Sequence, residues 1–266
     1  MANSRSGESL IQRLVRVLHA FDSDHPELTA TELADRAELS SSTAHRLAAD
    51  MAEEGLLRRT PGGGFRIGLV LWELGQRSSS YQEFGQAALP FMEAVHVTQR
   101  QNTSLAILDD QEHTIIYLER LISRDVPTDL TKVAGRLPVL STAAGLAILA
   151  FSPRSLQDRY LCEPWDPITR DSGVTESGLR RRLAQTRTDG YVHLRGVAVA
   201  GSSGTAAPVF GTGGKVLGAL SIVAPVDQVN LQVQAPTLLA AARGLSRQMG
   251  FRRMIGVQAF HSEPEG

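Results

Sequence analysis

Apolar side chains recur at helical spacing near the start of the chain. Between residues 10 and 21 they fall on one side of a helical wheel, with Arg13 and Arg16 on the other side. This pattern predicts an amphipathic helix whose apolar face must pack on another surface. The polar, proline-containing segment from Asp22 to Glu27 ends that helix.

The segment from Thr29 onward predicts two short helices separated by a turn. Thr29 and Glu32 have the spacing of a capping box, which starts the first helix. The turn falls at Leu39-Ser40-Ser41. One face of the second helix is a buried stripe of Ala44, Leu47, Ala48 and Met51. The opposite face carries small or hydrogen-bonding side chains that can approach base edges and phosphates, namely Ser42, His45, Arg46 and Ala49.

A two-stranded ribbon is predicted directly after these helices. Gly55 ends the second helix, and a strand, a glycine-rich turn and another strand follow between residues 56 and 67. Two helices followed by such a ribbon form a winged helix-turn-helix, whose second helix lies in the major groove of DNA. The ribbon contacts the DNA backbone, and Arg58, Arg59 and Arg66 would bind its phosphates.

The charge of this segment argues against a simple DNA-binding interpretation. Residues 1–68 contain eight arginines and ten acidic residues, a formal charge of −2, whereas DNA-binding domains are usually basic. Four of the arginines nevertheless fall on the ribbon and on the exposed face of the second helix, and the glutamates cluster at helix ends and turns. The alternative is a helical hairpin and ribbon that contact another protein.

The remaining pattern predicts a second domain that mixes strands and helices. Helices are predicted at 84–98, 143–151, 155–161, 176–188 and 235–250, and strands at 103–108, 114–118, 191–194, 204–210 and 216–223. The serines at 78–80 mark the boundary between the domains. We therefore expect a winged helix-turn-helix at 1–68, a linker helix at 69–80, an α+β domain at 81–250 and a disordered tail at 251–266.

Composition narrows the class of protein. Cys162 is the only cysteine, so neither an internal disulfide nor a cysteine-based zinc cluster can form, and a reducing, cytoplasmic location is favoured. No apolar run approaches the ~20 residues that span a bilayer. The formal net charge is −1, so any attraction to nucleic acid must come from a local patch.

Four features resemble parts of enzyme sites, and each has a simpler interpretation. The segment 211–215 lacks the full pattern of a phosphate-binding loop, and 201–204 does not match G-x-S-x-G. The seven histidines include no i, i+4 pair suited to zinc. Asp109 and Asp110 fit a solvated turn better than an acid–base pair. No cofactor or metal is therefore indicated, although a metabolic enzyme with a helical interaction module stays open as the alternative function.

Several motifs, taken in order, resemble the IclR-type family of transcriptional regulators. They are LTATELADRAELSSSTAHRL, the ribbon, LPVLSTAAGLAILAF, GSSGTAAPVF and LGALSIVAP, and the resemblance runs from about Ser9 to Met249. It implies a winged helix-turn-helix joined to a GAF-like effector-binding domain. It also implies a homodimer or a dimer of dimers whose binding to operator DNA is controlled by a small molecule, and it leaves repression or activation open.

The resemblance places the family's DNA contacts on the second helix of the motif. Where the family often has lysine, this chain has Ser41, so one phosphate contact is absent. Together with the helix caps and the ribbon arginines, the candidate DNA-binding residues are Thr29, Ser40, Ser41, Ser42, Thr43, His45, Arg46, Arg58, Arg59 and Arg66.

The resemblance also assigns an effector pocket. Its candidate residues are Leu130, Leu140, Thr142, Ala143, Ala144, Leu194, Gly204, Ser221 and Val223. Family members that bind small oxoacids carry an acidic residue, a cysteine and a serine at the places of Leu194, Gly204 and Val223. Many members have histidine at Leu140 and lysine at Leu146.

These departures make the expected pocket less polar. A small, fully polar acid would lose its hydration without gaining enough partners, so we expect a larger effector, aromatic or partly aliphatic. The backbone amides of Ala143 and Ala144, at a helix N-terminus, would hold a carboxylate or carbonyl oxygen. Taken singly, the three leucines at 130, 140 and 194 fit a hydrophobic core better than a pocket, and Ser221 fits a strand hydroxyl satisfied by its neighbours.

Overall fold

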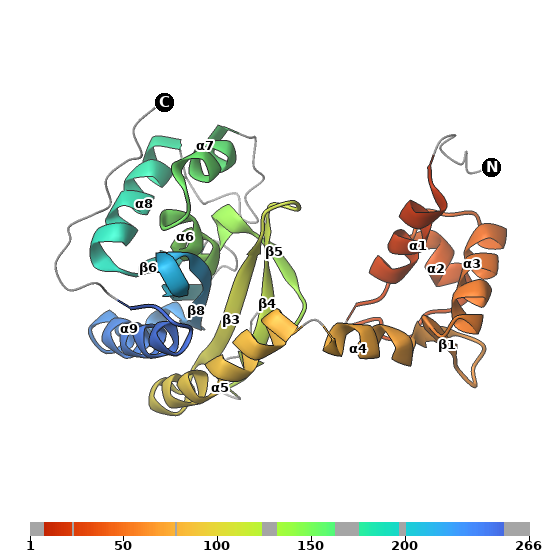
Figure 1. The fold of residues 1–266 in the computed structure, drawn as a ribbon, viewed down its shortest axis with the longest axis horizontal. Helices are drawn as coiled ribbons and strands as arrows, with labels where there is room; N and C mark the ends of the chain where they lie inside the picture. Colours follow the sequence, from red (N-terminus) through yellow and green to blue (C-terminus); the bar gives the residue numbers. More distant parts are fainter. Residues whose placement is uncertain are drawn as a thin grey trace. The chain divides into compact units, whose positions relative to one another are not determined.

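The computed structural model describes residues 8–22, 24–77, 79–123, 132–162, 176–196 and 201–252 (Figure 1). The chain divides into two compact units, Met1–Gln82 and Glu83–Gly266. The tail predicted at 251–266 lies outside the described residues from position 253 onward.

The core of the N-terminal unit is formed by helices α1 (Leu10–His19), α2 (Ala30–Arg36) and α3 (Ser41–Glu53). Val17, Leu33 and Met51 are at most 2% exposed and belong to one cluster, which the first strand and Phe65 complete. The apolar stripe predicted for α3 is confirmed, since its four members are all buried.

Side-chain caps determine where these helices begin. In the predicted capping box, Glu32 Oε2 accepts the backbone N–H of Thr29 at 2.7 Å. A second capping box, formed by Ser9 and Gln12, starts α1 and was not expected. Ser40 caps α3, so Ser41 is the first residue of that helix and the prediction that it belongs to the turn was wrong.

The predicted ribbon is present after α3. Strands β1 (Leu57–Arg59) and β2 (Phe65–Ile67) pair antiparallel, with Arg58 opposite Arg66. Gly63 has a φ of 80° in the turn between them, a conformation that glycine adopts without strain. Helix α4 (Leu69–Gln76) follows, so the helical run from Leu69 ends four residues before Ser80.

Within its described residues, the C-terminal unit contains a six-stranded antiparallel sheet in the order β5-β4-β3-β8-β7-β6. The strands are β3 (Asn102–Asp109), β4 (Thr114–Leu121), β5 (Arg136–Pro138), β6 (Val192–Arg195), β7 (Ser202–Phe210) and β8 (Val216–Pro225). The short edge strand β5 was not predicted. The other five overlap the predicted strands and mostly extend them by one to three residues.

Helices cover both faces of this sheet (Figure 1). One face packs against α5 (Ser79–Gln99) and α9 (Leu231–Gln248), and the other against α6 (Ala143–Ala150), α7 (Arg154–Cys162) and α8 (Glu176–Asp189). The predicted α+β architecture is confirmed. Pro90 lies inside α5, which begins five residues before the predicted helix start at Phe84.

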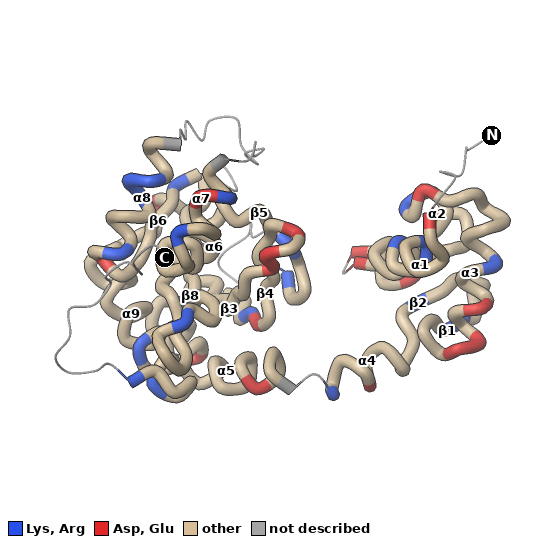
Figure 2. The backbone as a smooth tube through the Cα atoms, turned by 45° about the horizontal axis from the view of Figure 1, so that its top comes forward, with Lys and Arg blue, Asp and Glu red and all other residues tan. Residues whose placement is uncertain are grey.

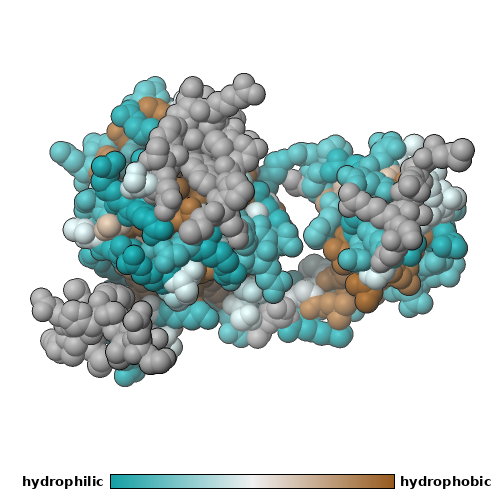
Figure 3. Space-filling view, turned by 90° about the horizontal axis from the view of Figure 1, so that it is seen from above, coloured by the Kyte–Doolittle hydropathy of each residue, from teal (hydrophilic) through white to brown (hydrophobic). Residues whose placement is uncertain are grey.

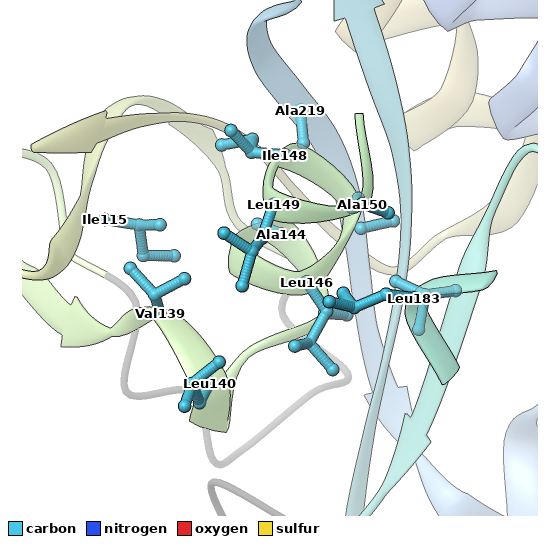
Figure 4. Close-up of a cluster of buried hydrophobic side chains, with 14 of the residues drawn as sticks. Ile115, Val139, Leu140, Ala144, Leu146, Ile148, Leu149, Ala150, Leu183 and Ala219 are labelled. Atoms are coloured by element: carbon cyan, nitrogen blue, oxygen red, sulfur yellow. The ribbon is translucent and has the colours of Figure 1, made fainter. Parts of the chain in front are cut away.

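Helix α6 is buried on all sides, and Figure 4 shows several of its side chains within a buried hydrophobic cluster. All eight of its residues are at most 6% exposed, because it packs between the sheet and α8. A Cβ atom at Gly145 would lie 2.1 Å from the carbonyl oxygen of Val139, in the short 3-10 turn η1 (Val139–Ser141) that precedes the helix. Only glycine permits this close approach, which fixes the start of α6 against the preceding turn.

Candidate DNA interface and effector site

The outer face of α3 is exposed and polar. Ser41, Ser42, His45 and Arg46 are exposed, whereas Thr43 is half-buried. Within the described residues, neither His45 nor Arg46 forms an ion pair or a side-chain hydrogen bond. These side chains are therefore available to reach an external partner from a helix that is held in place by its buried face.

Thr29, Ser40 and Thr43, among the candidate DNA-binding residues, take part in helix caps. The Ser40 hydroxyl accepts the backbone N–H of Thr43 at 3.3 Å and lies 2.8 Å from its Oγ1. The Thr29 hydroxyl donates to Glu32 Oε2 at 2.8 Å. Thr29, Ser40 and Thr43 therefore define where α2 and α3 begin, and a role in binding DNA remains a proposal for them.

The three arginines of the ribbon differ in their surroundings. Arg58 is exposed and has no ion-pair partner within the described residues. The guanidinium of Arg59 lies 5.0 Å from the centroid of the Phe65 ring, a cation–π distance. Arg66 Nη2 lies 2.6 Å from Glu27 Oε2. Sequence reasoning missed Glu27 because it lies 39 positions away along the chain.

Acidic and basic residues are interspersed over the N-terminal unit, as Figure 2 shows. Arg16 pairs with Glu8 at 2.7 Å, and Arg36 pairs with Asp22. Arg46 on α3 and Arg58 on the ribbon, in contrast, have no ion-pair partner within the described residues and are available to a polyanion. The negative total charge of the segment is thereby compatible with a locally positive surface.

The candidate effector residues that the structure describes lie around the start of α6 and on the facing side of the sheet. Leu194 pairs with Gly204 across β6 and β7, and Gly204 pairs with Val223 across β7 and β8. A Cβ atom at Gly204 would lie 3.2 Å from Ala143 Cβ, so this sheet position is directly beneath α6. The candidate Leu130 lies outside the described residues.

Apolar members of this set are also part of the hydrophobic core. Leu140, Ala143, Ala144 and Leu194 are at most 6% exposed and belong to the cluster around α6 (Figure 4). Packing alone therefore accounts for their residue types, and contact with an effector remains a proposal. Val223 and Gly204 are half-buried.

Polar side chains also lie at the start of α6 and on the sheet beneath it. Ser221 Oγ lies 3.3 Å from Ser104 Oγ on the adjacent strand β3, and the two residues are opposite each other in register. The Thr142 hydroxyl accepts the N–H of Gly145 at 3.0 Å and so caps α6, as predicted. Ser141 is 1% exposed, and its Oγ has no hydrogen-bond partner within the described residues. Neither Ser104 nor Ser141 was expected as a site residue.

Contacts at two other positions explain features that resembled enzyme sites. Asp109 Oδ2 lies 2.6 Å from Arg136 Nη1, and both oxygens of Asp110 lie 2.7 Å from Arg159 Nη2. The hydrogen bond from Arg136 lowers the pKa of Asp109 despite some burial, which does not suit a proton-transferring group. These aspartates instead fix the β3–β4 hairpin to β5 and α7.

The glycine-rich segment 211–215 is a hairpin turn between β7 and β8, closed by the Gly211 N–H and the Lys215 carbonyl at 2.8 Å. In the part of the chain that the structure describes, no group of three histidine, cysteine or acidic residues is arranged to bind a metal ion. Among the same residues, no helix has the length and hydropathy needed to cross a membrane.

Two family profiles match the chain. Residues 76–249 match "Bacterial transcriptional regulator IclR C-terminal", and residues 10–61 match the "IclR helix-turn-helix domain". The curated relatives include the HTH-type transcriptional regulator XynR of Escherichia coli, which is 28% identical over 91% of this chain and 97% of its own length.

Two solved structures are more similar in sequence. An IclR homolog from Microbacterium hydrocarbonoxydans, complexed with 4-hydroxybenzoate, is 36% identical, with 91% of this chain and 99% of that chain covered and a TM-score of 0.84. An IclR homolog from Microbacterium sp. strain HM58-2 is 34% identical, with 92% and 100% covered and a TM-score of 0.59.

Proposed function

The chain belongs to the IclR family of bacterial transcriptional regulators, and from that premise we propose that a small organic effector controls its binding to operator DNA in the cytoplasm. Its curated relatives are named as transcriptional regulators rather than enzymes. The observation that carries the proposal is the exposed polar face of α3, with Arg46 at its centre, on a helix whose other face is buried.

In this proposal α3 enters the major groove and the β1–β2 ribbon lies on the adjacent backbone. His45 and Arg46 reach base edges, and Arg58, Arg59 and Arg66 contact phosphates. The candidate contacts Ser41 and Ser42, at the exposed start of α3, reach a neighbouring phosphate.

A second copy of the chain is part of the proposal. Large apolar side chains are exposed on α1 and α4, including Ile11 at 72%, Leu69 at 66% and Trp72 at 61%, and Figure 3 shows hydrophobic surface on the N-terminal unit. Covering such surface favours self-association. A dimer, or a dimer of dimers, would place its recognition helices on half-sites separated by roughly one helical turn or a multiple of it.

A mobility-shift assay on the DNA flanking the protein's own gene tests this function. The full-length protein should retard one of these fragments at a concentration that leaves an unrelated fragment of equal length free. Addition of the effector should change the fraction retarded, because a ligand that prefers one arrangement of the protein shifts its DNA affinity. Absence of any shift, together with turnover of a metabolite, would support the enzyme alternative.

We propose an aromatic acid as the class of effector. The relative with 36% identity is complexed with 4-hydroxybenzoate, which has an apolar ring and a polar group at each end. In this chain Leu194 and Val223 supply apolar surface. The amides of Ala143 and Ala144 at the start of α6, and the Ser141 hydroxyl, which has no partner among the described residues, supply donors for a carboxylate. The Ser104–Ser221 pair offers hydroxyls to the other end of the ligand.

Calorimetry should therefore show that 4-hydroxybenzoate binds and that glyoxylate and pyruvate bind at least about tenfold more weakly, a difference of about 1.4 kcal/mol. The Val223→Ser variant, which restores a polar side chain found in oxoacid-binding relatives, should narrow this difference. The Gln111→Ser variant, in the exposed β3–β4 turn, serves as its control. Tight binding of glyoxylate or pyruvate to the unmodified protein would refute the proposed effector class.

A further inference from the structure

An acidic side chain is held against the ribbon that the proposed function places on DNA. Glu27 lies in the segment before α2, and its Oε2 is 2.6 Å from Arg66 Nη2 on β2. The side chains of Glu27 and Arg66 are 40% and 45% exposed. The pair is therefore at the surface, where an approaching phosphate meets both charges.

Backbone contacts hold the two segments together. Leu28 and Phe65, which adjoin Glu27 and Arg66 in the sequence, form an isolated β-bridge. The Leu28 N–H donates to the Phe65 carbonyl at 2.9 Å, and the Phe65 N–H donates to the Leu28 carbonyl at 2.7 Å. The position of Glu27 beside the ribbon therefore does not depend on the ion pair alone.

Thr60, at the base of the ribbon turn, also holds the Glu27 carboxylate. Its hydroxyl accepts the N–H of Gly64 at 3.1 Å, and its side chain hydrogen-bonds to Glu27. The hydrogen bond from Thr60, followed by that from Arg66, lowers the pKa of Glu27. Glu27 is therefore a fixed negative charge at neutral pH.

This charge affects two kinds of DNA complex differently. Binding to non-operator DNA depends on the number of phosphates that basic side chains neutralise. A carboxylate beside Arg66 reduces the attraction of that arginine and repels the backbone. In the operator complex, base contacts from α3 fix the register. There, an Arg66 already held in one position loses less side-chain freedom when it meets its phosphate, which offsets the repulsion.

We propose that Glu27 is a specificity-determining residue of the DNA interface, acting by positioning and neutralising Arg66 so that non-operator DNA is bound more weakly relative to the operator. The proposal rests on the proposed function and, within it, on contact between β2 and the DNA backbone. Arg58, on the strand opposite, has no such partner within the described residues. Its attraction for phosphates is therefore not weakened by a neighbouring carboxylate.

The test uses the full-length protein and its Glu27→Gln variant, since glutamine can still accept the hydrogen bond of Thr60 but carries no charge. Fluorescence anisotropy measures binding to operator and non-operator duplexes of equal length between 50 and 200 mM salt. The variant should bind non-operator DNA roughly 3- to 10-fold more tightly at low salt, with a plot of log K against log salt steeper by about 0.9. Its affinity for the operator should rise less, so that the ratio of the two affinities falls.

Glu93→Gln is the control matched in charge, because Glu93 is an exposed residue of α5 in the other unit; it should leave both the affinities and the slopes unchanged. In an Arg66→Ala background, Glu27→Gln should increase non-operator binding much less, because only the direct repulsion of the backbone is then relieved. Equal thermal unfolding midpoints would show that the ribbon is intact.

The proposal is overturned if Glu27→Gln leaves non-operator affinity and salt slope as they were, or if the increase is equally large without Arg66. Failure of the unmodified protein to bind any operator would instead refute the proposed function. A third outcome is that the protein binds the operator but Arg66→Ala changes neither its DNA affinity nor its salt slope. In that case β2 does not contact DNA, and the role of Glu27 is refuted while the regulator function stands.

Discussion

The Arg46→Ala variant is expected to bind operator DNA about 1 to 3 kcal/mol more weakly than the unmodified protein, a loss of roughly 5- to 150-fold. Arg46 is exposed on α3 and has no ion-pair partner within the described residues. Its guanidinium can therefore donate two hydrogen bonds to a guanine without first breaking an internal contact. Anisotropy titrations at fixed salt measure the loss, and substitution of single base pairs in the operator should identify the base that Arg46 contacts.

Two further arginine variants show whether Arg46 contacts a base, a phosphate or neither. Arg58→Ala, on the ribbon, should weaken binding to operator and non-operator DNA by similar factors and make the salt slope shallower by about 0.9. Arg243→Ala removes an equal charge from the exposed side of α9 and should change neither. If Arg46→Ala behaves like Arg58→Ala, Arg46 contacts phosphate and carries no sequence information. If it behaves like Arg243→Ala, α3 does not lie on DNA through this residue.

Truncation of Leu146 to alanine should lower the free energy of unfolding of the C-terminal unit by about 2 to 5 kcal/mol. Leu146 is 1% exposed and belongs to the same buried cluster as Leu183 of α8 (Figure 4). The missing carbon atoms leave a cavity, since the fixed start of α6 and the sheet beneath it prevent the helix from collapsing into the space. Urea denaturation followed by circular dichroism measures the change.

The Val97→Ala variant provides the comparison, because Val97 is 74% exposed on α5. Its effect should stay within about 0.5 kcal/mol. A similarly small effect of Leu146→Ala would mean that α6 is loosely packed. The same packing disfavours a lysine at this position, since its ammonium group would be buried without a partner.

Local signals in the sequence were sufficient for much of the fold. The Thr29 and Thr142 caps fixed two helix starts, and Gly55 marks the end of α3 with a φ of 73°. Each depends on residues within four positions of one another, so a single sequence contains the whole signal. The strands of the β7–β8 hairpin were recognisable for the same reason, because a glycine turn separates two apolar runs.

Features that depend on distant residues were not predictable in this way. Glu27 and Arg66 meet because Leu28 bridges Phe65, and Ser104 faces Ser221 because β3 and β8 are neighbours in the sheet. No local pattern encodes either pairing. Only the fold shows where the candidate effector residues lie relative to the hydrophobic core. In the sequence, a leucine such as Leu140 or Leu194 looks the same whether it contacts a ligand or packs in the core.

The burial of α6 on every side has a thermodynamic consequence for the ligand proposed at its N-terminus. A binding site that becomes ordered only when its ligand arrives loses conformational entropy at that step, which weakens binding. Here the helix is already held by Gly145 against Val139 and by the Thr142 cap, so this part of the entropy is lost during folding. The affinity contributed by α6 should therefore reflect the match between its amides and the ligand, with little cost for ordering the helix.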